Sequence, residues 1–340
     1  MKGIFMYDNE LLHLIKTKDK DEIESLFAQA RKIRETHYGK SVFIRGLIEI
    51  TNYCKNDCYY CGIRCSNKKL ERYRLSLETI LDCCRTGENL GIKTFVLQGG
   101  EDPWFTAERV TEIVSVIRKE FTHHAITLSL GERSAADLEK FFCAGSNRYL
   151  LRHETACDDH YAKIHPASQT LSSRKSTLQT LKKIGYSVGS GFMVGTPGQS
   201  YESLLADLRY LEELQPQMVG IGPFLPQKDT PFGNEAPGNL NLCLKMTALT
   251  RILLPLSLIP ATTAMETIAP NGRELALNAG ANVVMPNLTP VPEKKLYAIY
   301  DNKTSIESEA AESFNNIKEK IISAGYKPDM SRADAITKQG

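Results

Sequence analysis

The chain has 340 residues, and its 42 Lys and Arg residues nearly balance 40 Asp and Glu residues, for a formal net charge of +2. This length suffices for two domains or for one barrel-sized domain with a large core. The basic residues are scattered, so neither nucleic acid nor a membrane is expected as a partner. No apolar run reaches the roughly 18 residues of a transmembrane helix, and the N-terminus is too short and acidic for a signal peptide. We therefore predict a cytoplasmic protein.

Apolar residues at helical spacing predict two helices between residues 9 and 38. Apolar stretches then alternate with helical patterns. The expected strands cover 42–50, 93–98, 124–130, 148–152, 188–194, 218–224, 261–265 and 282–285. The expected helices cover about 76–90, 106–121, 134–144, 170–184, 200–214, 240–254, 272–279 and 305–324. Eight such units predict an α/β fold, a complete (β/α)8 TIM-type barrel. We expect an N-terminal helical cap over 1–40, the barrel over 41–326 and a poorly structured tail over 327–340.

Distinctive polar residues follow the predicted strands. They include G-G-E-D after the second strand, L-G-E after the third, R-H-E-T after the fourth and M-P-N after the eighth. In (β/α)8 barrels the active site is built at the C-terminal ends of the strands. The sequence therefore predicts a functional site at this end.

Three cysteines follow the first predicted strand in a C-x3-C-x2-C array, Cys54, Cys58 and Cys61. Clusters of the [4Fe–4S] type are normally held by four thiolates, so three thiolates leave one iron open to a small molecule. A structural zinc site is a weaker interpretation of this array. Such sites usually have four ligands in two close pairs, and the only further thiolate nearby, Cys65, has no close partner to form a second pair. Disulfides are disfavoured in a cytoplasmic chain with nine cysteines, and chance core cysteines are disfavoured in so polar a loop.

With Tyr60 directly before the last cysteine, this array resembles that of the radical S-adenosylmethionine (SAM) enzymes. The resemblance implies that the amino and carboxylate groups of SAM chelate the open iron. It also implies that an electron from the reduced cluster breaks the sulfur–C5′ bond and yields a 5′-deoxyadenosyl radical. The cofactors expected are thus a [4Fe–4S] cluster with three Cys ligands, and SAM.

Further elements fit this resemblance. The turn at Gly100 and Glu101 lies where radical SAM enzymes bind the SAM amino group. Beside SAM, Glu154 could accept hydrogen bonds from the ribose hydroxyls, and Arg174 could pair with the methionine carboxylate. An ordinary strand-to-helix turn, a structural ion pair and a surface arginine are the plainer interpretations of these residues. Satisfied core hydroxyls and core packing are likewise the plainer interpretations of several Thr and Tyr residues of the predicted barrel.

The resemblance is closest to the [FeFe]-hydrogenase maturase HydE family. It rests on stretches such as E-I-T-N-Y-C-K-N-D-C-Y-Y-C-G-I-R, V-L-Q-G-G-E-D-P, R-Y-L-L-R-H-E-T-A and G-A-N-V-V-M-P-N-L-T-P. The implied SAM residues are Tyr60 (by its backbone), Gly100, Glu101, Ser129, Glu154 and Arg174. The implied substrate cavity is lined by Thr127, Arg152, Thr262, Thr263, Tyr297 and Tyr300, with the two tyrosines on one helical face.

The same resemblance implies a role in assembling the di-iron subcluster of the hydrogenase active site. The substrate would be a cysteine-bound iron carbonyl cyanide species made by the maturase HydG, and the product would pass toward HydF. An electron donor is a further expected partner. Two features depart from relatives: no cysteine follows Cys243, so no second cluster is expected, and Gly99 stands where Ser would be expected.

Two other functions stay open. Methylornithine synthase shares the Y-C-K-N-x-C element and the G-E-D-P turn, so a radical SAM mutase that makes a small amino acid is the main alternative. A non-enzymatic iron–sulfur carrier or scaffold is the second alternative. A carrier would need four cluster ligands and no SAM pocket.

Overall fold

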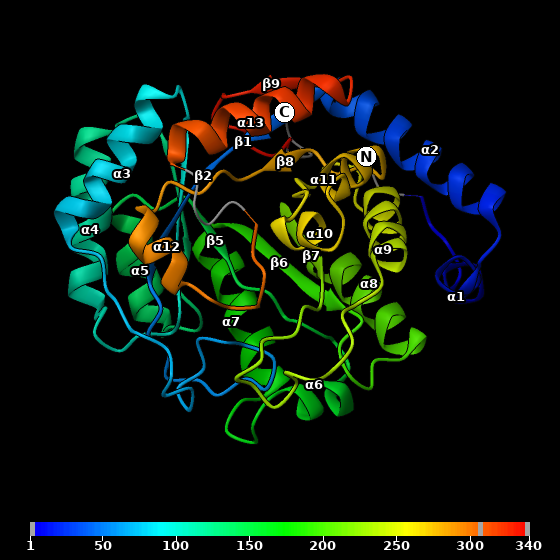
Figure 1. The fold of residues 1–340 in the computed structure, drawn as a ribbon, viewed down its shortest axis with the longest axis horizontal. Helices are drawn as coiled ribbons and strands as arrows, with labels where there is room; N and C mark the ends of the chain where they lie inside the picture. Colours follow the sequence, from blue (N-terminus) through cyan, green and yellow to red (C-terminus); the bar gives the residue numbers. More distant parts are fainter. Residues whose placement is uncertain (1–3, 305–308, 337–340) are drawn as a thin grey trace.

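Strands and helices alternate through most of the chain in the computed structural model, which describes residues 4–304 and 309–336. The strands are β1 (Ser41–Ile44), β2 (Gly46–Thr51), β3 (Thr94–Gly99), β4 (Ala125–Ser129), β5 (Arg148–Leu150), β6 (Ser187–Val194), β7 (Met218–Pro223), β8 (Val283–Val284) and β9 (Lys327–Asp329). The helices between them surround the strands (Figure 1). The predicted α/β class is confirmed.

The strands form two parallel sheets. The larger has the order β2-β3-β4-β5-β6-β7, and the smaller has the order β8-β1-β9. Isolated bridges join Met218 to Leu258, Pro260 to Val283 and Leu47 to Asn287. Pairing therefore continues from β7 through residues 258–260 to β8, and from the segment after β8 back to β2.

The helices mostly begin where the sequence offers a capping side chain. They are α1 (Asp8–Lys16), α2 (Lys20–Tyr38), α3 (Leu77–Asn89), α4 (Ala107–Glu120), α5 (Ala135–Cys143), α6 (Asp158–Ile164), α7 (Leu171–Ile184), α8 (Tyr201–Leu214), α9 (Leu240–Leu253), α10 (Thr263–Ile268), α11 (Gly272–Asn278), α12 (Val291–Leu296) and α13 (Ala310–Ser323). Ser76, Thr106, Ser134, Thr170 and Ser200 each accept a hydrogen bond from a backbone N–H of the first turn. Each cap fixes the point at which a strand-to-helix loop ends.

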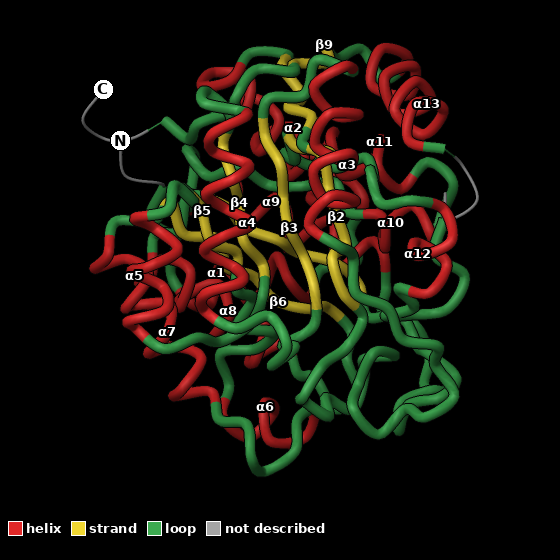
Figure 2. Tube along the Cα trace, turned by 90° about the vertical axis from the view of Figure 1, so that its left-hand side faces the viewer, coloured by secondary structure: helices red, strands yellow, loops and turns green. Residues whose placement is uncertain are grey.

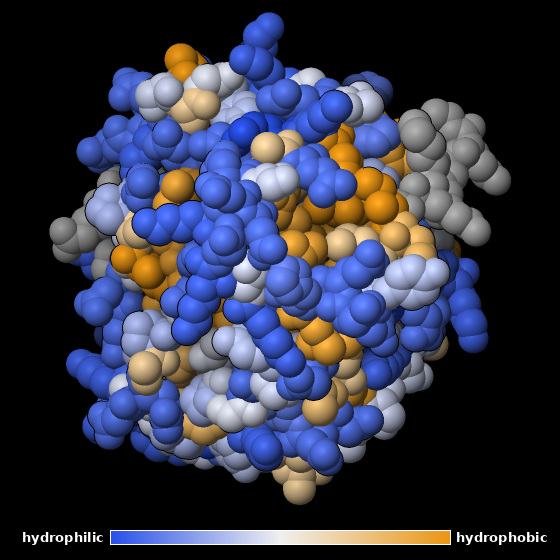
Figure 3. Space-filling view, turned by 90° about the vertical axis from the view of Figure 1, so that its right-hand side faces the viewer, coloured by the Kyte–Doolittle hydropathy of each residue, from blue (hydrophilic) through white to orange (hydrophobic). Residues whose placement is uncertain are grey.

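The two N-terminal helices extend the outer helical layer. Helix α2 contacts α9 and α11, and α1 contacts α8 and α9. Lys245 of α9 donates its Nζ hydrogens to the carbonyls of Ile15 and Thr17, which closes the end of α1. On this side of the molecule hydrophilic side chains predominate, with hydrophobic patches between them (Figure 3). Among the described residues, none of the helices is both long and apolar enough to cross a bilayer.

The predicted strand over 261–265 is wrong. Residues Thr263–Ile268 form α10, and the strand position holds only the bridges at Leu258 and Pro260. Proline has no N–H to donate to a ladder, and Thr262 stands at the N-cap position of α10. The prediction also missed α6 and α12, and it joined β1 and β2, which are separate strands on either side of Arg45.

The tail from residue 327 was expected to be poorly structured, and this is wrong for its first residues. Lys327–Asp329 form β9 and pair with β1. The carbonyl of Ala333 then accepts hydrogen bonds from the buried side chains of Arg45 and Arg148. Buried guanidinium groups require such acceptors, so this segment belongs to the core. Residues 305–308, where the predicted last helix starts, and residues 337–340, at the end of the tail, lie outside the described residues.

Candidate active site

Loops gather at one end of the strands (Figure 2), and the three cysteines lie in the loop that follows β2. Cys54, Cys58 and Cys61 are half-buried, and the Cys61 N–H donates to the Cys58 carbonyl at 3.3 Å. Burial raises the pKa of Cys58 to about 12, with a further contribution from Cys54. Burial, and then Cys58 and Cys54, raise the pKa of Cys61 as well. Thiols whose pKa values are raised in this way lose their protons only to a cation that binds the thiolates, such as the iron of a cluster.

The described residues include no group of three or more His, Cys, Asp or Glu side chains that could hold a single metal ion. In a [4Fe–4S] cluster each thiolate binds a different iron, so its ligands need not converge on one point. The three cysteines therefore fit a cluster through their chemistry and their common loop.

One arginine supports much of this loop from within. Arg72 donates hydrogen bonds to four backbone carbonyls, those of Asn52, Ile63, Arg64 and Asn67. Asp57 pairs with Arg64 at 2.5 Å, and this hydrogen-bonded pair lowers the pKa of Asp57. This role of Arg72 was not predicted from the sequence. The only feature there that points to it is the run of basic residues after the cysteines.

The turn at Gly100 and Glu101 lies directly against the cysteine loop. A Cβ atom at Gly100 would lie 2.2 Å from the Tyr53 carbonyl oxygen and 2.7 Å from the Cys54 Cβ. The Lys55 N–H donates to the Glu101 carbonyl at 2.9 Å. Only glycine permits this approach, so the structure brings these two sequence motifs together.

The Glu101 side chain is buried and points toward a second predicted residue. Its carboxylate lies 3.5 Å from the Lys55 Nζ and 4.0 Å from the Arg174 guanidinium. A Cβ at residue 131 would lie 1.8 Å from the Glu101 Cγ, so Gly131, with φ of +73°, leaves room for this carboxylate. Gly131 is a second residue that the sequence analysis missed.

Arg174 is buried in the first turn of α7. Burial by itself would lower the pKa of Arg174, but Tyr161, Glu101 and Glu132 raise it. Its Nε atom lies 3.0 Å from Glu132 yet forms no aligned hydrogen bond among the described residues. A charged guanidinium with an unsatisfied donor is suited to bind a carboxylate.

Glu154 has a left-handed backbone with φ of +65°, which is rare for a residue other than glycine. Its carboxylate lies 2.9 Å from Arg152, and its buried Oε2 atom forms no aligned hydrogen bond. Its charge contributes to the raised pKa of Cys61, so it lies on the cysteine side of the strand ends. Strain of this kind is typical of functional sites.

Tyr60 uses its side chain for packing. Its hydroxyl forms a 3.2 Å hydrogen bond with the Nε2 atom of His165, and His165 stacks on Tyr161 at 3.9 Å. Burial, and then Arg174, lower the pKa of His165 to about 3, so this imidazole is neutral. The side chain of Tyr60 is therefore held in place by His165.

The hydroxyls predicted in the substrate cavity have different partners. The Oγ1 atoms of Thr127 and Thr262 are buried without a hydrogen-bond partner among the described residues, whereas Thr263 accepts from Arg273 at 3.1 Å. Ser129, at the end of β4, is half-buried and pairs in register with Gln98 of β3. Buried unpaired hydroxyls are uncommon and call for a ligand or water.

The predicted helical face of Tyr297 and Tyr300 is wrong. Helix α12 ends at Leu296, so Tyr297 is its C-cap and Tyr300 lies in the next turn. Tyr297 is nevertheless buried in the protein interior, where its hydroxyl accepts a hydrogen bond from the Gln98 side chain at 3.4 Å. Next to it, Lys303 lies 5.1 Å from the Tyr297 ring and 2.5 Å from the buried carboxylate of Glu49. This ion pair was missed because 254 positions separate its members.

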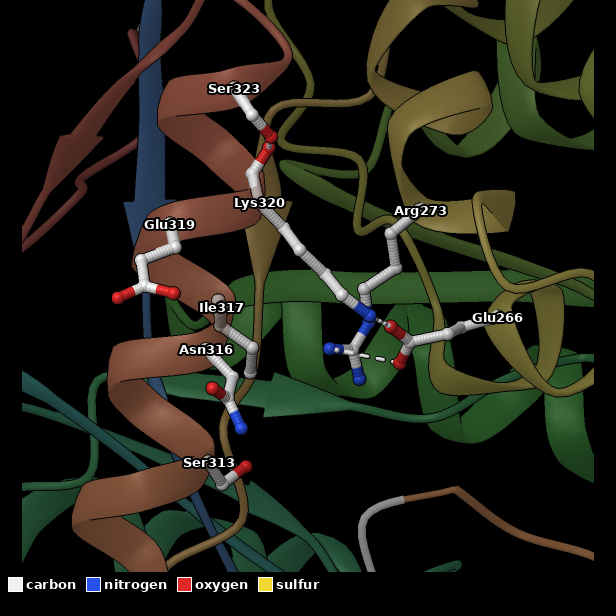
Figure 4. A pocket seen from close by; sticks show the side chains of 8 residues that line it. All are labelled: Glu266, Arg273, Ser313, Asn316, Ile317, Glu319, Lys320 and Ser323. Carbon is white, nitrogen blue, oxygen red and sulfur yellow. Dashed lines mark hydrogen bonds and ion pairs between the residues drawn. The ribbon is translucent and has the colours of Figure 1, made fainter.

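A cavity of about 300 Å³ lies elsewhere, between α10, α11 and α13 (Figure 4). Glu266 occupies its inner wall, 3.1 Å from Arg273 and 2.5 Å from Lys320. None of the predicted site residues lines this cavity. We place the chemistry at the cysteine loop, because the clustered thiols and the unsatisfied polar atoms lie there.

The comparisons with known proteins identify the family. The model of the Radical SAM superfamily matches residues 48–211. The [FeFe] hydrogenase maturase subunit HydE of Thermotoga maritima is 46% identical over 94% of this chain and 90% of that protein. The 3-methylornithine synthase of Methanosarcina barkeri is 34% identical over 88% of this chain and 85% of that protein.

The solved structures agree with the sequence comparison. The crystal structure of methylornithine synthase (PylB) superimposes with a TM-score of 0.87 at 31% identity, over 98% of this chain and 96% of that one. The maturase HydG superimposes with a TM-score of 0.80 at 21% identity, over 97% of this chain and 73% of that one, which shows a shared fold. The three cysteines, the glycine turn against them and these similarities lead to one conclusion. The chain belongs to the radical SAM superfamily.

Proposed function

We propose that this radical SAM enzyme acts in [FeFe]-hydrogenase maturation, on a cysteine-bound iron carbonyl cyanide precursor of the di-iron subcluster. The observation that carries the proposal is the 46% identity with a HydE maturase over 94% of the chain. HydG as the source of the substrate and HydF as the recipient of the product belong to the same proposal, as does a cytoplasmic location.

The proposed cofactors are one [4Fe–4S] cluster on Cys54, Cys58 and Cys61, and SAM. Together they supply one-electron cleavage of the sulfur–C5′ bond. In this proposal the residues of the chain bind and orient SAM. Glu101 binds its amino group, and Arg174 binds its carboxylate. We propose that Glu154 accepts hydrogen bonds from the ribose hydroxyls; its buried Oε2 atom forms no aligned hydrogen bond among the described residues and lies 2.9 Å from Arg152.

Ser129 completes the proposed SAM site, and Thr127, Arg152, Thr262, Thr263, Tyr297 and Tyr300 form the proposed substrate cavity. The unpaired hydroxyls of Thr127 and Thr262 support this cavity. We further propose that residues 41–326 form a closed (β/α)8 barrel, with residues 1–40 as its helical cap. The bridges at Leu258, Pro260 and Asn287 support closure. A closed barrel would exclude water and shield a reactive carbon radical.

A second candidate function is rearrangement of a small amino acid. It is favoured by the 34% identity with 3-methylornithine synthase and the TM-score of 0.87 with PylB. A passive electron carrier is disfavoured, because the cluster loop offers a three-cysteine array, whereas a carrier would need four cluster ligands.

The test is turnover of the anaerobically reconstituted and reduced protein. One reaction contains SAM with a synthetic cysteine-bound iron carbonyl cyanide complex, and a parallel reaction contains SAM with lysine. Mass spectrometry would detect 5′-deoxyadenosine or an adenosylated cysteine product, and electron paramagnetic resonance would follow the iron product. Turnover with the iron complex alone supports the maturase. Conversion of lysine to a methylated, rearranged amino acid would replace it with the mutase.

A further inference from the structure

The segment R-H-E-T after β5 holds its third residue in a strained conformation. Glu154 has φ of +65° although it carries a side chain. Its N–H donates to the Gly191 carbonyl, and its own carbonyl accepts from the Met193 N–H, each at 3.1 Å, so its backbone is tied to β6. A left-handed backbone in such a residue is costly and persists only where the surroundings enforce it. Neighbouring groups must therefore hold Glu154 in place.

One carboxyl group contacts the chain on both sides of Glu154. Asp207 lies on α8, which packs against β6, and its side chain is fully buried. Its Oδ1 atom accepts a hydrogen bond from the Ala156 N–H, two residues after Glu154. The same Oδ1 atom lies 3.4 Å from the Nε2 atom of His153, the residue before Glu154, in a contact without hydrogen-bond alignment. A single oxygen atom thus fixes the segment before and after the strained residue.

His153 is also fixed on the opposite edge of its ring. Its Nδ1 atom forms a 2.9 Å hydrogen bond with the Oγ atom of Ser190, which lies on β6. The ring of Tyr210, three positions after Asp207 on α8, packs edge-on against the imidazole with 5.0 Å between ring centres. Buried polar contacts therefore run from β6 through the R-H-E-T segment to α8.

Burial keeps this chain of side chains uncharged. Burial, and then the charge of Arg152, lower the pKa of His153, so its imidazole is neutral. Burial raises the pKa of Asp207, and the nearby charge of Glu154 raises it further. A neutral carboxyl group still accepts the Ala156 N–H through its carbonyl oxygen. An amide at position 207 would therefore preserve this contact.

Ser190, His153 and Asp207 are also the residue types of a hydrolase triad. The serine of a triad must reach a substrate, but all three side chains here are 0% exposed. The ring contacts are exchanged as well, because the serine bonds to Nδ1 and the carboxyl group lies at Nε2. The arrangement therefore fits a positioning role and not nucleophilic catalysis.

We propose that Asp207, through His153 and the Ala156 N–H, is a positioning residue that aims the carboxylate of Glu154 at the ribose of SAM. The inference rests on the SAM contact of the proposed function, but not on the identity of the substrate. Without this support the segment would relax toward an ordinary backbone with negative φ. The Cα–Cβ bond of Glu154 would then point in another direction, and its carboxylate would leave the ribose.

The test measures the Kd for SAM of the reconstituted protein by equilibrium binding, with iron and sulfide per chain to show that the cluster is intact. Asp207→Ala removes the carboxyl group, and we expect the Kd to rise at least fivefold. Asp207→Asn keeps an oxygen for the Ala156 N–H and should stay within twofold of wild type. Adding Asp207→Ala to Glu154→Gln should raise the Kd less than twofold further, because residues that act through one another are not additive.

The matched control is Gln217→Ala. Gln217 likewise offers a side-chain oxygen to a backbone N–H, that of Val188 near the start of β6, at 2.9 Å. This variant should leave the Kd for SAM within twofold of wild type. Where Asp207→Ala yields no folded protein, Ser190→Ala takes its place in the same double-variant comparison. It removes only the hydroxyl that holds His153, and it should raise the Kd at least threefold.

Three results would overturn the proposal: an unchanged Kd in Asp207→Ala, an equal rise in Asp207→Asn, or effects that multiply in the double variant. A purely structural role of Asp207 would give the last of these, because general destabilisation weakens SAM binding whether or not Glu154 is present. An unchanged Kd in Glu154→Gln would instead refute the proposed SAM contact of Glu154, and this inference with it.

Discussion

At the scale of single residues, the site contains buried polar atoms that form no aligned hydrogen bond among the described residues. The Oγ1 atom of Thr127 has no hydrogen-bond partner in that part of the chain, whereas the Oε2 atom of Glu154 lies 2.9 Å from Arg152 and the Nε atom of Arg174 lies 3.0 Å from Glu132 in ion pairs. Leaving a buried hydroxyl such as that of Thr127 unpaired costs about 1–3 kcal/mol. The coexistence of these polar atoms beside the three cysteines is most simply explained by a bound polar molecule.

Replacing Glu154 by Gln should weaken SAM binding without loss of the cluster. A hydrogen bond to a charged group contributes about 1.5–3 kcal/mol, so the Kd for SAM should rise about tenfold to a hundredfold. Equilibrium binding to the reconstituted protein measures this change. The control is Glu132→Gln, which removes a partner of Arg174 but no proposed SAM contact of its own. An unchanged Kd for Glu154→Gln would remove Glu154 from the SAM site.

Gly100→Ala should displace the cysteine loop, because the new Cβ would lie 2.2 Å from the Tyr53 carbonyl. We expect loss of most bound iron after reconstitution, measured as iron and sulfide per chain. Gly91→Ala is the control. It likewise adds a Cβ, here at a positive φ that Gly100 does not have, but nothing lies within 4 Å of that Cβ. Equal iron content in the two variants would show that the close approach of the turn is unimportant.

At the scale of elements, the C-terminal segment completes the fold. Strand β9 pairs with β1, and the following residues accept hydrogen bonds from Arg45, Arg148 and Thr94. The guanidinium N–H groups of Arg148 cannot turn to water instead, because this residue is only 1% exposed. The segment thus supplies acceptors that the strands cannot provide themselves.

Deleting residues 327–340 should destabilise the protein strongly. Removing the partner of a buried charge costs about 3–5 kcal/mol, and β1 also loses a neighbouring strand. Urea unfolding should show a decrease of at least this size in the free energy of unfolding. Asp334→Asn tests the ion pair alone. It should cost less than about 1 kcal/mol, because Asp334 is 62% exposed. Equal stability of the truncated and full-length chains would contradict this account of the segment.

At the scale of the whole molecule, the proposed chemistry requires one cluster. The loop after β2 provides three cysteines, whereas Cys83, Cys84 and Cys243 are buried in helices. Burial raises the pKa of Cys243, so its thiol is a poor metal ligand. Of the other cysteines, Cys65 lies farther along the same loop, whereas Cys143 ends α5 and Cys157 is the N-cap of α6.

We therefore expect about four irons and four sulfides per reconstituted chain. The triple variant Cys54→Ala/Cys58→Ala/Cys61→Ala should bind no cluster, and Cys65→Ala should retain the full complement. Iron analysis with electron paramagnetic resonance of the reduced protein checks these values. About eight irons per chain would show a second cluster, and loss of iron in Cys65→Ala would show a fourth thiolate ligand.

The sequence by itself determined the local features of this protein. Apolar stretches located most strands and helices, because hydrophobic periodicity acts over a few residues. The cysteine spacing and the turn at Gly100 indicated the site for the same reason. Each motif is short, and its chemistry depends on residue type rather than on distant partners.

Only the tertiary structure decided the rest, because contacts between distant positions were involved. The strand-like pairing with Val283 ends at Ala261, and α10 begins directly afterwards with Thr262 as its N-cap. The tail became part of the core, because buried arginines far away in sequence required its carbonyls. The room for Glu101 at Gly131 and the pairing of Glu49 with Lys303 likewise depend on segments that meet only when the sheets form.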